Sequence, residues 1–126
     1  MGAAWLAREL RNKGLADQIE VASCGIGTRG GMAASSEAII VMKNREVDIS
    51  SHRSRACTRR DVWDADLIFA MSEEHCNFIA GMVPEAKEKI QVLNIPDPIG
   101  MGMYIYEEVI EALERKLKEK WNDIAA

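Results

Sequence analysis

Residues 90–100, Ile-Gln-Val-Leu-Asn-Ile-Pro-Asp-Pro-Ile-Gly, decide how this chain folds. The first five are mostly apolar and predict a buried strand. The strand is expected to end at Pro96 and Pro98, because a proline fixes its own φ and biases the residue before it towards extended backbone. Asp97 lies between the two prolines and is therefore held on a loop at the carboxyl end of a strand. In α/β folds this edge of the sheet is where ligands bind.

Helical patterns and apolar runs alternate on the N-terminal side of this stretch. Strands are predicted at residues 18–23, 66–71 and 90–94. Helices are predicted over residues 2–13, from Ser35 or Ser36, from Thr58 to Asp64, over 73–82 with a further turn from Pro84, and from Tyr104 to Ile124. Because helices separate the strands, the sheet is expected to be parallel. The predicted fold class is therefore α/β, a three-layer α/β/α arrangement in one domain, residues 1–126.

Polar side chains that can accept hydrogen bonds from free backbone N–H groups precede several of these helices. Either Ser35 or Ser36 can cap the second helix, and Ser72 can cap the helix that starts at Glu73. Thr58 is followed three residues later by an aspartate, which resembles a capping box. These residues predict where the helices begin.

Composition and charge exclude several classes of protein. The chain has 126 residues, 48% of them hydrophobic and 29% charged, as in an ordinary globular protein. Its net charge of −4 argues against nucleic acid or an anionic membrane as a partner. No apolar run approaches the ~18 residues of a membrane span, and the N-terminal residues do not form a signal peptide.

The cysteines predict a reduced, cytoplasmic protein. Cys24, Cys57 and Cys76 are odd in number and widely spaced, which is not the pattern of a disulfide framework. Together with His52 and His75 they contain no closely spaced pair of the kind that holds zinc. We therefore expect neither a metal nor a cofactor.

Two polar loops leave alternatives open. The glycine-rich stretch at 24–31 follows an expected strand, and such loops can cradle phosphate when they open a helix. It lacks the complete motifs of nucleotide-binding loops, so an ordinary flexible connection is the alternative. The basic stretch at 50–55 is either a solvated connection or a loop that contacts an anion.

The order of these segments resembles the low-molecular-weight protein tyrosine phosphatases, including their bacterial arginine-phosphatase and arsenate-reductase relatives. Residues 1–3 with the following helix resemble the segment after the family's phosphate loop, and residues 21–25 resemble its second strand and turn. Residues 48–55, Asp-Ile-Ser-Ser-His-Arg-Ser-Arg, are similar to its "DIS-HxxR" loop. Residues 66–71 resemble its third strand, and Asp97-Pro98 its general-acid loop. Together these matches cover nearly all of the chain.

This resemblance implies a phosphomonoesterase that acts on phosphotyrosine or phosphoarginine proteins through a cysteine thiolate, without a cofactor. It assigns Asp97 as the general acid and base, and Ser23 and His52 as supports of the phosphate loop. Arg29 aligns with a pocket-wall position that often carries Trp or Tyr. Glycines after Asp97 and a later Tyr106 look more like the arginine-phosphatase branch. Tyrosine and arginine specificity both stay open.

The departure from the family is the Cys-x5-Arg phosphate loop. Six residues after the three cysteines stand Gly30, Trp63 and Met82, so none of them is followed by the required arginine. The resemblance places this loop and the central first strand of the sheet before Met1. Either the natural protein begins further upstream or the chain is a truncated product. We expect the 126 residues to lack the nucleophile and to be inactive alone.

The expected loss of the central strand leaves two sheet edges unpaired. The chain would then close its sheet, borrow a segment from a second copy in a homo-oligomer, or be partly ordered.

The resemblance leaves three functional hypotheses: a phosphatase that acts only with the missing segment, a non-catalytic pseudophosphatase that serves as a binding module, and an arsenate reductase. An arsenate reductase needs a redox relay as well as the first cysteine, and Cys76 lies nearer the N-terminus than the relay position that we expect.

Overall fold

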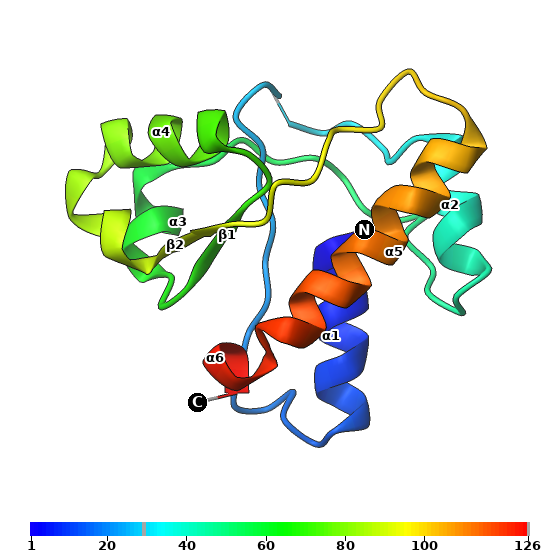
Figure 1. Cartoon of the computed structure of the whole chain (residues 1–126), viewed down its shortest axis with the longest axis horizontal. Helices are drawn as coiled ribbons and strands as arrows, with labels where there is room; N and C mark the ends of the chain where they lie inside the picture. The colour runs from blue at the N-terminus through cyan, green and yellow to red at the C-terminus, as the bar shows by residue number, and fades with distance from the viewer. Residues whose placement is uncertain (29, 126) are drawn as a thin grey trace.

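A computed structural model describes residues 1–28 and 30–125. Helices dominate this part of the chain and surround a small sheet (Figure 1). The elements in chain order are α1 (Gly2–Asn12), α2 (Ser36–Lys43), α3 (Arg59–Asp64), β1 (Ile68–Ala70), α4 (Glu73–Met82), the 3-10 helix η1 (Pro84–Lys89), β2 (Ile90–Val92), α5 (Met103–Glu119) and α6 (Trp121–Ala125). Among these described helices none is both long and apolar enough to cross a membrane.

The sheet consists of β1 and β2, which pair in parallel with Ile68 opposite Ile90. Backbone hydrogen bonds continue past the strand ends, since the Leu93 N–H donates to the Ala70 carbonyl at 2.8 Å. Likewise, the Ile95 N–H donates to the Met71 carbonyl at 2.8 Å. The predicted α/β class with a parallel sheet is confirmed.

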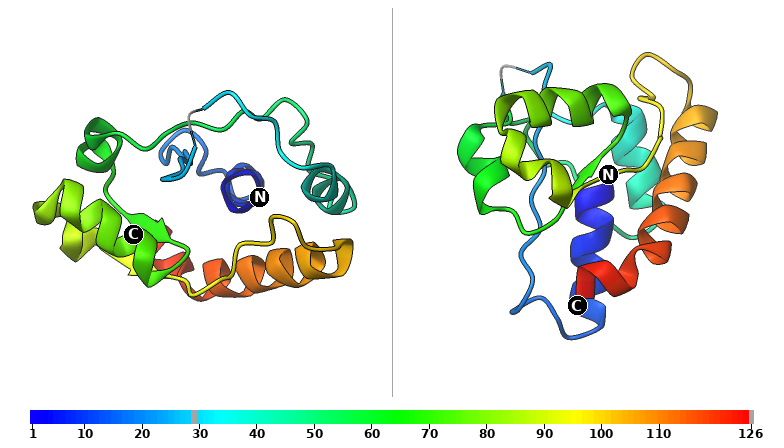
Figure 2. Two further views of the ribbon diagram at one scale, coloured as in Figure 1. Left: turned by 90° about the horizontal axis from the view of Figure 1, so that it is seen from above. Right: turned by 60° about the vertical axis from the view of Figure 1, so that its left-hand side comes forward.

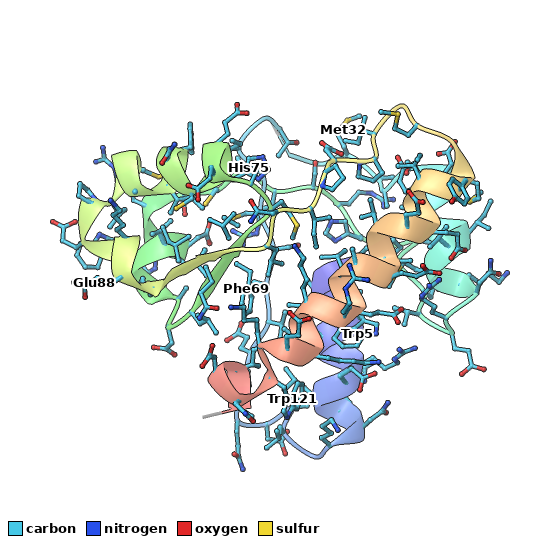
Figure 3. All side chains as sticks on the ribbon, viewed as in Figure 1. Trp5, Met32, Phe69, His75, Glu88 and Trp121 are labelled. Atoms are coloured by element: carbon cyan, nitrogen blue, oxygen red, sulfur yellow. The ribbon has the colours of Figure 1, made fainter. Side chains whose placement is uncertain are left out.

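Apolar clusters lie on both faces of this sheet, so the fold has three layers. One cluster joins α3, α4 and η1 and takes Ile68 from β1. The larger cluster joins α1, α2 and α5 and takes Phe69 from β1. Trp5 of α1 is only 2% exposed in the larger cluster, where α1 packs against α5 (Figure 3). Alternation of side chains along β1 therefore supplies both cores.

The predicted helix caps are confirmed. Ser35 Oγ accepts a hydrogen bond from the Ala38 N–H at 3.2 Å, and Ser72 Oγ caps α4. Thr58 and Asp61 form the reciprocal capping box at the start of α3. At the end of α1, Gly14 adopts φ +72°, a left-handed conformation that glycine takes without steric cost.

The strand predicted at 18–23 is wrong. The chain from residue 19 to residue 24 runs past α1 as an extended segment outside any sheet (Figure 1). Its first backbone pairing with another segment is at Gly25, which forms an isolated parallel bridge with Ala56. A strand needs a hydrogen-bonding neighbour along its length, and no described residue supplies one here.

The single C-terminal helix predicted to run to Ile124 is also wrong. It divides into α5 and α6 at Lys120, whose backbone leaves helical geometry. Trp121, the first residue of α6, packs against the larger cluster. In the last turn of α5, Lys116 Nζ donates to the Leu93 carbonyl and so links the helix to the residue after β2.

Candidate functional site

Asp97 lies on the loop between β2 and α5, with its side chain exposed to solvent. Ile95, two residues earlier, is 4% exposed and anchors the start of the loop. Asp97 Oδ1 accepts a hydrogen bond from the Ile99 N–H at 3.0 Å, as in an Asx turn. The Met101 N–H donates to the Pro98 carbonyl at 2.9 Å and closes the next turn. The acid is therefore held by its own loop, in agreement with the two flanking prolines.

A hollow of about 370 Å³ lies beside the first turns of α1. Its wall on α1 is made of the small side chains Ala3, Ala4 and Ala7, and its other walls come from residues 21–23 and the loop after α2. Ser23 and His52, which sequence analysis singled out separately, both line it. Asp97 does not belong to its described lining. Arg29, the expected pocket wall, lies outside the residues that the structure describes.

Two arginines that sequence analysis did not single out as site residues also line this hollow. Arg53 Nη1 donates to the carbonyl of His52 at 2.8 Å. Arg55 donates to the Ser23 carbonyl at 3.4 Å and to Asp61 Oδ1 at 2.7 Å. No acidic side chain is among the described residues that line the hollow, but Asp61 neutralises Arg55, so Arg53 supplies the positive charge that favours an anion there.

A second group of chemically active side chains surrounds the Gly25–Ala56 bridge. The sulfur atoms of Cys24 and Cys57 and a carboxylate oxygen of Asp61 all lie within 4.8 Å of one another. Desolvation of the sulfur, its hydrogen bond with Cys57 and the nearby Asp61 charge raise the pKa of the Cys24 thiol to about 12. The cysteine spacing in the sequence did not reveal this group, because the contact forms only when two distant segments meet.

The comparisons with known proteins agree on one family. The family model described as low molecular weight phosphotyrosine protein phosphatase matches residues 1–125. The Geobacillus stearothermophilus protein-arginine-phosphatase is 31% identical over 123 residues, which cover 88% of this chain and 82% of that protein. The Escherichia coli K12 low molecular weight protein-tyrosine-phosphatase Wzb is 28% identical over 109 residues, 81% of this chain and 74% of that protein.

The solved structures show the same fold. The low molecular weight protein tyrosine phosphatase from T. tengcongensis superposes with a TM-score of 0.85 at 30% identity, over 94% of this chain and 88% of that one. This chain likewise has a parallel sheet between helices, with Asp97 on the loop that follows its last described strand. The chain belongs to the low molecular weight phosphotyrosine protein phosphatase family.

Proposed function

We propose that this chain forms the body of a protein phosphatase whose nucleophilic thiolate and phosphate-binding arginine come from outside the 126 residues. Asp97 acts as the general acid and base, and the substrate is a phosphotyrosine or phosphoarginine protein. The observation that carries this proposal is the hollow beside α1. Ser23 and His52, the two residues that resemble the family's phosphate-loop supports, both line it.

The shape and charge of the hollow suit a strand and loop that lead into α1. Its α1 wall is made of alanines, and small side chains let another backbone approach closely. Arg53, on the loop after α2, adds positive charge to the lining. The N-terminus of α1, a helix of 11 residues, adds the partial positive charge of its backbone N–H groups. A thiolate and a phosphate placed there would both be stabilised.

The proposed reaction has two steps. The supplied thiolate attacks phosphorus, the bond from phosphorus to the leaving oxygen or nitrogen breaks, and the Asp97 carboxyl donates its proton to the leaving atom. The Asp97 carboxylate then takes a proton from water, whose oxygen attacks phosphorus and releases the thiolate. The hydrogen bond from the Ile99 N–H to Oδ1 orients the carboxyl group for both transfers.

The first experiment joins the family's first strand and Cys-x5-Arg loop in front of Met1 and measures hydrolysis of para-nitrophenyl phosphate. We expect turnover from the extended protein and none from the 126-residue chain. Asp97→Asn in the extended protein should lower kcat about 100-fold or more, since general acid catalysis is worth roughly 10²–10⁴. Asp17→Asn, an exposed acid on a distant turn, is the matched control. Equal turnover with and without the extension would contradict the proposal.

Substrate class is then tested by measuring kcat/KM of the extended protein for two peptides that differ only in the phosphorylated residue, phosphotyrosine in one and phosphoarginine in the other. Ile99, which follows the acid loop, is exposed and apolar but not aromatic, so it cannot stack on a phenyl ring. We propose that phosphoarginine is the preferred substrate for this reason, and a higher kcat/KM for the phosphotyrosine peptide would contradict that choice. The chain is expected to act in the cytoplasm.

The alternative function is a non-catalytic binding module. It is favoured by the extended segment between residues 19 and 24, whose backbone has no hydrogen-bonded strand neighbour among the described residues. In that case the extended segment between residues 19 and 24 pairs with a second copy, and the chain forms a homo-oligomer. Analytical ultracentrifugation of the 126-residue chain tests this proposal. A dimer that dissociates when the first strand is added in front of Met1 would support pairing through this segment, and a monomer in both forms would contradict it.

A further inference from the structure

The cysteine and aspartate group beside α3 has no part in the phosphatase chemistry proposed above. Cys24 ends the extended segment from residue 19, Cys57 precedes α3, and Asp61 lies in the first turn of that helix. The Gly25 N–H donates to the Arg55 carbonyl at 2.8 Å, and the Cys57 N–H donates to the Gly25 carbonyl at 2.9 Å. These two backbone bonds hold together the two chain segments that carry the thiols.

We propose that Cys24, Cys57 and Asp61 bind one thiophilic divalent cation, with Zn²⁺ as the best match to two sulfurs and one oxygen. Zinc binds cysteine sulfur at about 2.3 Å and carboxylate oxygen at about 2.0–2.2 Å in tetrahedral geometry. Two sulfurs on one such ion stand about 3.8 Å apart. The three ligand atoms already lie within 4.8 Å of one another, so they need to approach by at most about 1 Å. Rotation about the cysteine χ1 bonds can supply that movement.

The carboxylate is held in place by partners that leave it able to bind. Asp61 Oδ1 accepts one hydrogen bond, from Arg55 at 2.7 Å. Asp61 Oδ2 accepts from the Thr58 N–H and hydroxyl, both at 2.9 Å. An ionised carboxylate offers about four lone-pair positions, so one on Oδ1 remains. Arg55 and Thr58 thus resemble the outer-shell partners that orient the ligands of metal sites.

The charges of the proposed site balance. Two thiolates and a carboxylate carry three negative charges, the cation carries two positive charges and the Arg55 guanidinium carries one. Cys24 is exposed, while Cys57 and Asp61 are half-buried, so the ion reaches the site directly from solvent. Three protein ligands leave the fourth tetrahedral position for water, as in open zinc sites.

The test is titration of the full reduced chain with ZnCl₂ and CoCl₂. We expect uptake of one equivalent, and a sulfur-to-cobalt charge-transfer band with the intensity of two thiolates. Cys24→Ser and Cys57→Ser should each raise Kd by more than about 100-fold, because loss of outer-shell partners alone often costs roughly 10–100-fold. Asp61→Asn, which preserves the shape of the capping residue, should raise Kd by about 10-fold or more.

Matched controls lie in the same chain. Cys76→Ser and Asp64→Asn, the latter in the last turn of α3, should each change Kd by less than about twofold. A second readout on the unmodified chain does not depend on the variants folding: Zn²⁺ should slow maleimide alkylation of Cys24 and Cys57 but not of Cys76. Absence of uptake, equal loss in Cys76→Ser, or recovery of a Cys24–Cys57 disulfide from reducing buffer would overturn the proposal.

Discussion

Substitution of Ala7 by leucine tests whether the hollow beside α1 is open in this chain. Ala7 lines that hollow of about 370 Å³ and also a second one of about 250 Å³ between α1 and the segment after it. Leucine adds three carbon atoms, each worth about 0.8 kcal/mol when fully buried. Because the hollow opens to solvent, we count half of this and expect a gain of about 1 kcal/mol in the free energy of unfolding. In a chain of this size that raises Tm by about 4 °C.

In the protein extended in front of Met1, the same substitution should lower the free energy of unfolding instead of raising it. If the added strand and loop occupy the hollow, the leucine side chain overpacks it and costs about 1–3 kcal/mol. Urea unfolding of both proteins, with and without Ala7→Leu, measures the two effects. Ala86→Leu is the control, since Ala86 is 2% exposed in the smaller apolar cluster and should destabilise both proteins by about 1–3 kcal/mol.

α1 lies between the extended segment before Gly25 on one side and α5 on the other (Figure 2), and it packs against α5. Ala7 and residues 19–21 line the hollow between α1 and the extended segment. Loss of more than about 1 kcal/mol on Ala7→Leu in the 126-residue chain would mean that the hollow is already filled by local rearrangement. An identical response of the short and extended proteins would refute the assignment of the hollow to a strand and loop.

Two further predictions concern electrostatics. Arg45→Met should lower the free energy of unfolding by about 1–2 kcal/mol, because Arg45 is 19% exposed and pairs with Glu107 at 2.9 Å and Glu114 at 2.5 Å. The control is Arg60→Met, at an exposed position, which should cost under about 0.5 kcal/mol. Urea unfolding measures both. Hydrogen bonds from Ser50 lower the pKa of Asp48, so this carboxylate stabilises the fold above its unfolded pKa and the contribution disappears as pH falls through its folded pKa. A carboxyl NMR titration with its midpoint at or above the usual Asp value would contradict this.

Local sequence determined most of the helices of this protein. The starts of α2, α3 and α4 follow from Ser35, Thr58 and Ser72, because a side-chain oxygen satisfies backbone N–H groups only a few residues away. The strand before Asp97 and the rigidity of its loop follow from an apolar run and two prolines. The family also follows from short motifs in a fixed order, and the comparison over residues 1–125 confirms it.

Tertiary structure decided those features that require contact between residues distant in the sequence. Residues 18–23 have the composition of a strand, yet a strand forms only where a neighbour offers its backbone groups, and none of the described residues does so. The periodicity predicts one C-terminal helix, whereas the folded chain divides it into α5 and α6 at Lys120. The Gly25–Ala56 bridge joins two segments that are distant in sequence. It brings Arg55 within hydrogen-bonding distance of the Ser23 carbonyl and places the Cys24 sulfur close to the Cys57 sulfur. Arg55 also donates to Asp61. Motifs in the sequence thus predict Asp97 as the general acid, whereas the hollow and the thiol group needed the folded chain, since each is built from segments that are distant in sequence.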